Sequence, residues 1–211
     1  MPLELVKNRH NEPLIISVNM PMGSVYCYVW RLKVGRITLI FLDTNIKENK
    51  TDQIKKITNA LYGGDRETRI QQEVILGIGG MRALEAIDMF PVCVHINEGH
   101  AAFALLERTR MLMKRYNLDF KAAKVLNNSS AVFTTHTPVP AGNEAFDVPK
   151  IDAYLNCYYS EFGLSKESFC QLGQFGNFNP SESFSMTILG LRMTTYRNGV
   201  SKLHGRVSRE M

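Results

Sequence analysis

The chain has 211 residues, 45% of them hydrophobic, and a formal net charge of +5 at pH 7. This composition is typical of a globular protein and excludes wholesale disorder, and the scattered basic residues lack the aromatic partners that a nucleic-acid-binding surface would carry. No apolar run reaches the length of a membrane span, and four dispersed cysteines without a CxxC pair favour a reduced, cytoplasmic protein.

Residues 13–42 are predicted to form antiparallel or mixed β-structure. Runs of β-branched and aromatic residues recur there and are separated by Gly23 and Gly35. The pattern then changes to helical spacing. We therefore expect a β-rich flank over residues 1–48 and an α/β core over residues 49–211, together forming one domain that is incomplete.

The first part of this core is predicted to be helical. Apolar residues at helical spacing predict three helices, over residues 50–61, 67–76 and 81–90. A turn at Gly63-Gly64-Asp65 separates the first two. Gly77-Ile78-Gly79-Gly80 could suggest a phosphate-binding loop, but a helical pattern precedes it and Arg82 stands where a third glycine is needed. A glycine-containing helix junction is the favoured interpretation.

Two short apolar runs, residues 92–96 and 131–135, are predicted to be buried strands. Amphipathic helices over residues 101–116 and 120–126 connect them. Continuous apolar runs in the order strand, helix, strand predict a mainly parallel sheet in which the two strands are adjacent or one strand apart. In that sheet Cys93 would be a buried thiol and His95 a core histidine.

The remainder of the chain is predicted to be a loop over residues 137–149 followed by helices. One helix covers residues 151–162, and another starts at Asn179-Pro180 and runs towards Tyr196. A final helical spacing reaches Met211 without a capping signal, so we expect the chain to be truncated there. Apolar residues exposed near Leu203 and Val207 would then promote self-association.

Both predicted strands end in polar residues, Asn97-Glu98-Gly99-His100 after the first and His136 after the second. Ligands of open α/β sheets bind at the carboxyl ends of strands, so these ends predict one shared polar site. The histidine spacing lacks an HExxH pattern, and a metal site is not favoured. From the residues alone, His136 could bind a ligand or only cap a loop, and Glu98 and Asp65 could be solvated turn carboxylates.

Several longer stretches carry a family resemblance. They are residues 29–36, 42–45, 61–66, 72–80, 97–103, 133–142 and 198–209, and they span nearly the whole chain. The most specific are Asn97-Glu98-Gly99-His100 and Thr135-His136-Thr137-Pro138. In order and content these stretches resemble the α-glucan (glycogen, starch and maltodextrin) phosphorylase family, especially its shorter bacterial and archaeal branch.

The resemblance implies a fold and an activity. Members of the family have two Rossmann-like lobes of the glycosyltransferase B type with pyridoxal phosphate between them. They transfer a glucosyl unit from an α-1,4-glucan to inorganic phosphate and release glucose 1-phosphate. This chain would be part of the N-terminal lobe, and its partner would be the C-terminal lobe that carries the cofactor lysine. No cofactor would then be anchored in this chain, which alone should be inactive.

The resemblance also implies roles for four residues. His136 would be the catalytic residue, contacting the glucosyl unit through its backbone carbonyl and stabilising positive charge on the sugar ring. Asp65 would lie in a loop that gates the site, and Glu98 and His100 would line the sugar pocket. The alternative is a glucan-binding or assembly module without chemistry of its own.

Overall fold

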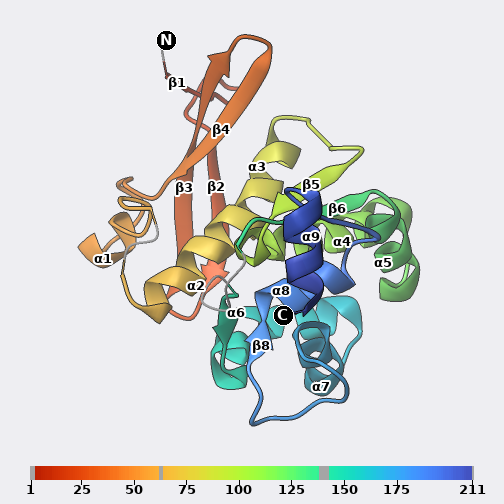
Figure 1. Ribbon diagram of the computed structural model, residues 1–211. Coiled ribbons are helices and arrows are strands. Elements are labelled where there is room, and N and C mark those ends of the chain that lie inside the picture. The colour runs from red at the N-terminus through yellow and green to blue at the C-terminus, as the bar shows by residue number, and fades with distance from the viewer. Residues whose placement is uncertain (1–2, 62–63, 138–142, 211) are drawn as a thin grey trace. The chain divides into compact units, whose positions relative to one another are not determined.

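The structure is a computed structural model and describes residues 3–61, 64–137 and 143–210. It divides into two compact units, residues 1–90 and residues 91–211. The first unit contains an antiparallel sheet and the second a parallel one (Figure 1). The chain is therefore a mixed α/β protein, as predicted. Within the described ranges, no helix is long and apolar enough to cross a membrane.

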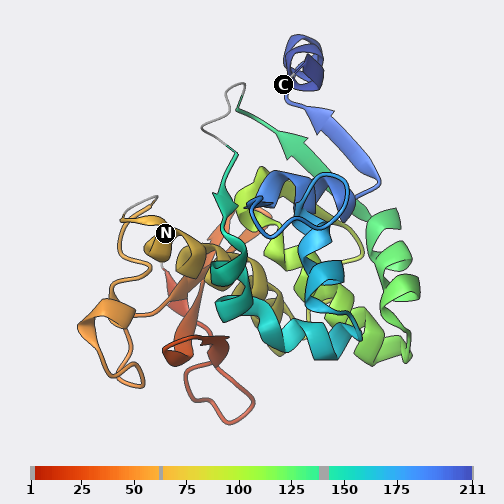
Figure 2. The ribbon, with the colours of Figure 1, turned by 90° about the horizontal axis from the view of Figure 1, so that it is seen from below.

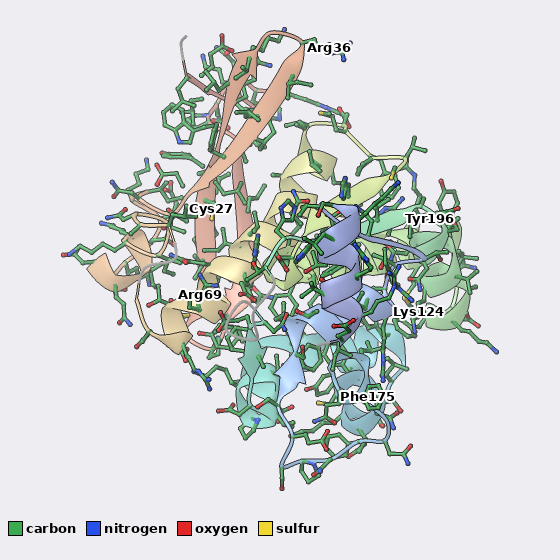
Figure 3. All side chains as sticks on the ribbon, viewed as in Figure 1. Cys27, Arg36, Arg69, Lys124, Phe175 and Tyr196 are labelled. Atoms are coloured by element: carbon green, nitrogen blue, oxygen red, sulfur yellow. The ribbon has the colours of Figure 1, made fainter. Side chains whose placement is uncertain are left out.

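The sheet of the first unit has four antiparallel strands. They are β1 (Glu4–Leu5), β2 (Ile15–Met20), β3 (Gly23–Val34) and β4 (Ile37–Asp43). β3 pairs with each of the other three. The register pairs Val34 with Ile37, so Gly35 and Arg36 form a two-residue turn, with Gly35 at a φ of +61° and Arg36 at the tip (Figure 3). The predicted β-structure over residues 13–42 is confirmed.

One face of this sheet is the core of the first unit. Its buried side chains alternate along the strands: Ile16, Val18, Val25, Cys27 and Val29. A Cβ atom added to Gly79 would lie only 3.1 Å from Leu42 Cδ1, so this glycine lets a helical segment approach the sheet closely. Burial, with a smaller contribution from the charge of Asp43, raises the pKa of the Cys27 thiol to about 12.

The helices of the first unit differ in extent from the predicted ones. They are α1 (Asp52–Lys55), α2 (Arg66–Val74), a π-helical segment (Ile75–Gly79) and α3 (Gly80–Ala86). Residues 77–80, which include three glycines, lie inside this continuous helical run. The interpretation of this segment as a glycine-containing junction between helices, and not a phosphate-binding loop, is therefore correct. The predicted helix over residues 50–61 is wrong beyond Lys55. Gln72 binds the carbonyl oxygens of Ile57 and Ala60, which holds that segment in turns. The helix predicted to Phe90 ends at Ala86.

Three parallel strands form the sheet of the second unit, β5 (Val94–Asn97), β6 (Ala131–Thr135) and β9 (Tyr196–Gly199), in the order β5-β6-β9. β9 lies beside β6 and leads into α9 (Lys202–Glu210) (Figure 2). The predicted parallel pairing of the two apolar segments is confirmed, and they are adjacent. The prediction that a helix runs to Tyr196 was wrong, because Tyr196 begins a strand paired to Val132.

Helices and a small two-stranded antiparallel sheet, β7 with β8, complete the second unit. They are a 3-10 turn (Gly99–Ala101), α4 (Phe103–Tyr116), α5 (Phe120–Ser129), β7 (Ala145–Phe146), α6 (Val148–Phe162), α7 (Lys166–Cys170), a second 3-10 turn (Gln171–Gly173), β8 (Phe184–Ser185) and α8 (Met186–Arg192). The predicted loop over residues 137–149 thus contains β7 and the start of α6, and residues 138–142 lie outside the described residues.

The helix expected at Asn179 begins instead after Ser185, whose side chain accepts a hydrogen bond from Ile188 N. The side chain of Gln174 explains the difference. It accepts from Asn179 N and donates to the carbonyl oxygens of Asn179 and Glu182. These bonds keep residues 179–182 in a turn.

The two faces of the parallel sheet are unlike. Ile96 and Phe133 are buried on one face, where Gly190 of α8 lies so close that an added Cβ would be 2.7 Å from the ring of Phe133. The other face carries exposed polar side chains, including His95. The predictions of a core histidine at His95 and a buried thiol at Cys93 were therefore wrong. Sequence could not distinguish the faces of so short an apolar run.

Candidate functional site

The polar residues after β5 and β6 come together at one edge of the parallel sheet. Asn97 pairs with Thr134 in the register, and Glu98 N donates to Thr134 O over 2.9 Å. Glu98 and His136 therefore begin neighbouring loops, and His100 follows in the 3-10 turn after β5. The adjacency follows from parallel pairing, because the carboxyl ends of parallel strands lie at the same edge.

Glu98 has a positive φ angle, and its side chain accepts two hydrogen bonds from backbone amides. Its φ is +62°, which is uncommon for a residue other than glycine, and the residue is buried. One carboxylate oxygen, Oε1, accepts from His136 N at 2.5 Å and from Thr137 N at 2.6 Å. Two successive amides thus converge on a single oxygen. Such an arrangement is a nest of N–H groups filled by an anionic side chain.

The residue after Glu98 must be small. Gly99 is buried, and a Cβ atom there would lie 2.8 Å from both Met186 C and Thr187 N. These are backbone atoms in the first turn of α8, so they cannot rotate away. The glycine therefore allows α8 to pack directly against the turn that carries Glu98 and His100.

His136 is exposed, and its ring is oriented by the strand next to it. Its Nε2 lies 3.0 Å from Asn97 Oδ1. An amide oxygen only accepts, so Nε2 carries the hydrogen and Nδ1 of the neutral ring keeps a free lone pair. Asn97 thus holds the side chain of His136 while Glu98 holds its backbone.

A second polar network crosses the exposed face of the sheet and was not anticipated from sequence. His95 Nε2 lies 2.6 Å from Thr134 Oγ1, and Thr134 donates to Asn198 Oδ1 over 3.0 Å. Since Thr134 has one hydroxyl hydrogen, His95 must be the donor in the first bond. Each of the three strands contributes one side chain. Only the register of three separated segments could have revealed this row.

His100 and Asp65 lie in different parts of the structure. His100 is half-buried, and its place in the wall of a sugar pocket remains a prediction. Asp65 belongs to the first unit, where it is the N-cap of α2. Its Oδ1 accepts from Thr68 N at 2.9 Å and from Thr68 Oγ1 at 3.1 Å, and these bonds lower the pKa of Asp65. The preceding Gly63 lies outside the described residues, and the gating role of Asp65 also remains a prediction.

Metal ions and aldehyde cofactors each bind through particular side chains. Among the residues that the structure places, no group of three or more His, Cys, Asp or Glu side chains is arranged to hold a metal ion. The two site segments, residues 94–100 and 131–137, contain neither lysine nor arginine. They therefore offer no amine for an aldehyde cofactor and no side-chain cation for its phosphate.

Comparison with known proteins places the chain in a family. It is 40% identical to a glycogen phosphorylase of Mycobacterium tuberculosis, 38% identical to a maltodextrin phosphorylase of Thermococcus litoralis and 32% identical to a glycogen phosphorylase of Aquifex aeolicus. Each match covers 100% of this chain but only 25%, 24% and 30% of the respective relative. No family model matches the chain. Over its whole length, the chain therefore corresponds to one segment, about a quarter to a third, of proteins of the glycogen and maltodextrin phosphorylase family.

Proposed function

We propose that this chain is part of an α-glucan phosphorylase. The enzyme would transfer a glucosyl unit from an α-1,4-glucan to inorganic phosphate and release glucose 1-phosphate. The observation that carries the proposal is the match of all 211 residues to glycogen and maltodextrin phosphorylases. The joined polar ends of β5 and β6 support it, because the motifs of strongest family resemblance are the ones that meet there.

His136 is proposed as the catalytic residue, acting through its backbone carbonyl. A glucosyl ring gains positive charge as its glycosidic bond breaks, and a fixed carbonyl dipole stabilises that charge without transferring a proton. Asp65, Glu98 and His100 are proposed to contact substrate with it. Both hydrogen bonds that Glu98 makes to the loop of His136 fit this assignment, since they restrict the position of the carbonyl.

Pyridoxal phosphate is proposed as the cofactor of the complete enzyme. The residues of this site do not fit the cofactor, for want of a lysine or arginine in either segment. The proposed role of His136 does not depend on the cofactor. We also propose that residues 49–211 belong to a Rossmann-like lobe of the glycosyltransferase B type and that residues 1–48 form its β-rich flank. The partner of this lobe would be a C-terminal lobe, and the location would be cytoplasmic.

The experiment compares wild type with His136→Ala in the intact protein that contains this chain. Glucose 1-phosphate released from maltodextrin and phosphate is measured. Alanine keeps the backbone carbonyl but removes the imidazole that Asn97 holds, so the loop that positions the carbonyl loses one of its contacts. We expect His136→Ala to lower kcat more than it raises KM, because the contact of a well-positioned carbonyl with the glucosyl unit strengthens as charge develops. His10→Ala, at an exposed histidine of the first unit, is the matched control and should behave as wild type. A change in KM alone would contradict the role of His136.

The 211-residue chain by itself should release no glucose 1-phosphate, with or without added pyridoxal phosphate. Catalysis of this kind depends on holding both reactants in one geometry, which requires both lobes. Activity of the chain, or Schiff-base absorbance at stoichiometric amounts, would refute the two-lobe assignment. If the intact protein binds maltodextrin without turnover, the alternative of a glucan-binding or assembly module is correct.

A further inference from the structure

The hydrogen bond from Thr137 N to Glu98 fixes the direction of the backbone carbonyl of His136. The N–H of Thr137 and the C=O of His136 belong to the same peptide unit. A peptide unit is planar and trans, so its N–H and C=O point in opposite directions. Because Thr137 N donates to Glu98 Oε1 at 2.6 Å, the carbonyl of His136 is directed away from Glu98.

The preceding peptide unit, which contains Thr135 C=O and His136 N–H, shows how the strand is oriented before this turn. His136 N donates to the same Oε1, and Thr135 O, in the same peptide unit as that N–H, accepts from Val200 N at 3.2 Å on the β9 side. In a regular strand the next N–H would point back towards β9. Here the N–H of Thr137 points to Glu98 again, so the strand does not continue beyond Thr135 and the carbonyl of His136 turns away from Glu98. The carboxylate of Glu98 accounts for this turn by binding both amides.

The same contact changes the charge on the carbonyl. Hydrogen bonds to a carboxylate are stronger than neutral ones, and a peptide whose N–H donates such a bond carries more negative charge on its oxygen. Glu98 is itself held firmly: it is buried, its own N–H is bonded to Thr134 O, and α8 packs against Gly99. It can therefore hold the loop without first being ordered by substrate.

From these contacts we infer that Glu98 is a positioning residue that aims and polarises the backbone carbonyl of His136. The inference rests on the proposed function, in which that carbonyl faces the glucosyl unit, and it assigns Glu98 an effect through the loop in addition to any contact with sugar. The geometry predicts that removing the carboxylate disturbs the carbonyl while leaving β6 and its pairing with β9 intact.

The first test measures amide hydrogen exchange by NMR in this 211-residue chain. In Glu98→Ala, the amides of His136 and Thr137 should exchange about tenfold to a hundredfold faster, corresponding to the loss of one charge-assisted bond each. The amide of Val200, which donates to Thr135 O, should keep its wild-type rate and is the internal control. In Glu98→Gln, which keeps an acceptor oxygen, protection should be largely retained. Unchanged exchange at both amides of Glu98→Ala would overturn the inference.

The second test uses kinetics of the intact protein. We expect Glu98→Ala to lower kcat by about tenfold to a hundredfold with KM within about threefold of wild type, and Glu98→Gln to recover part of kcat. Glu210→Gln, at an exposed carboxylate of α9, is the matched control. A raised KM with unchanged kcat would mean that Glu98 only binds substrate, and would overturn the inference. If wild type itself lacks phosphorolysis, the proposed function fails, while the exchange rates still decide whether Glu98 holds the loop.

Discussion

Replacing Gly99 with alanine tests how closely α8 is packed against the site. An added Cβ would lie 2.8 Å from Met186 C and 2.8 Å from Thr187 N, a separation that real Cβ atoms do not adopt. Both neighbours are backbone atoms, so relief requires α8 to move as a unit. We expect Gly99→Ala to lower the free energy of unfolding by about 1–3 kcal/mol, the usual cost of overpacking an interior.

Urea denaturation followed by far-ultraviolet circular dichroism measures this loss. With a denaturant slope of about 2 kcal/mol per M, the midpoint should fall by about 0.5–1.5 M. Gly205→Ala in α9 is the matched control, since its Cβ would be 3.9 Å from Gly199 N, an ordinary contact. There the better helix propensity of alanine should leave stability unchanged or raise it by up to about 1 kcal/mol. A Gly99→Ala variant as stable as wild type would refute the close packing of α8.

Three further predictions concern other parts of the chain. Hydrogen bonds from Thr68 lower the pKa of Asp65, so its carboxylate should stabilise the fold above its ordinary pKa of about 3.9 and lose this contribution as the pH falls through the lowered value. Asp65→Asn keeps a capping oxygen but should remove that pH dependence from acid denaturation curves. Cys27, with a pKa raised to about 12 by burial, should react with a thiol reagent only after unfolding, whereas the exposed Cys93 should react at once in titrations of single cysteine-to-serine variants. Leu203 is 64% exposed on α9, so sedimentation should detect concentration-dependent self-association that Leu203→Lys weakens.

The elements that sequence predicted well are those whose signal is local. Residues 131–135 form β6 with the predicted bounds, because an apolar β-branched run of that length has no competing helical spacing. The antiparallel strands between residues 15 and 43 follow from runs of β-branched and aromatic residues separated by Gly23 and Gly35. The parallel pairing of β5 and β6 followed from the helices between them, since a crossover of that length joins parallel strands.

Other features were decided only by tertiary contacts. Tyr196–Gly199 is short and polar, and it is a strand because β6 offers it a partner edge. No helix begins at Asn179, because the side chain of Gln174 forms hydrogen bonds with the backbone N–H and C=O of that residue.

The candidate site shows the same division. Its residues were predicted from the polar ends of two strands, and the family resemblance supplied their proposed roles. The contact of Glu98 with the amides of His136 and Thr137 joins positions 38 and 39 residues apart. No local pattern encodes it, because a glutamate on a turn has the same sequence signature whether it is solvated or holds a neighbouring loop. The parallel register of β5 and β6 and the close approach of α8 at Gly99 decide which of the two it does.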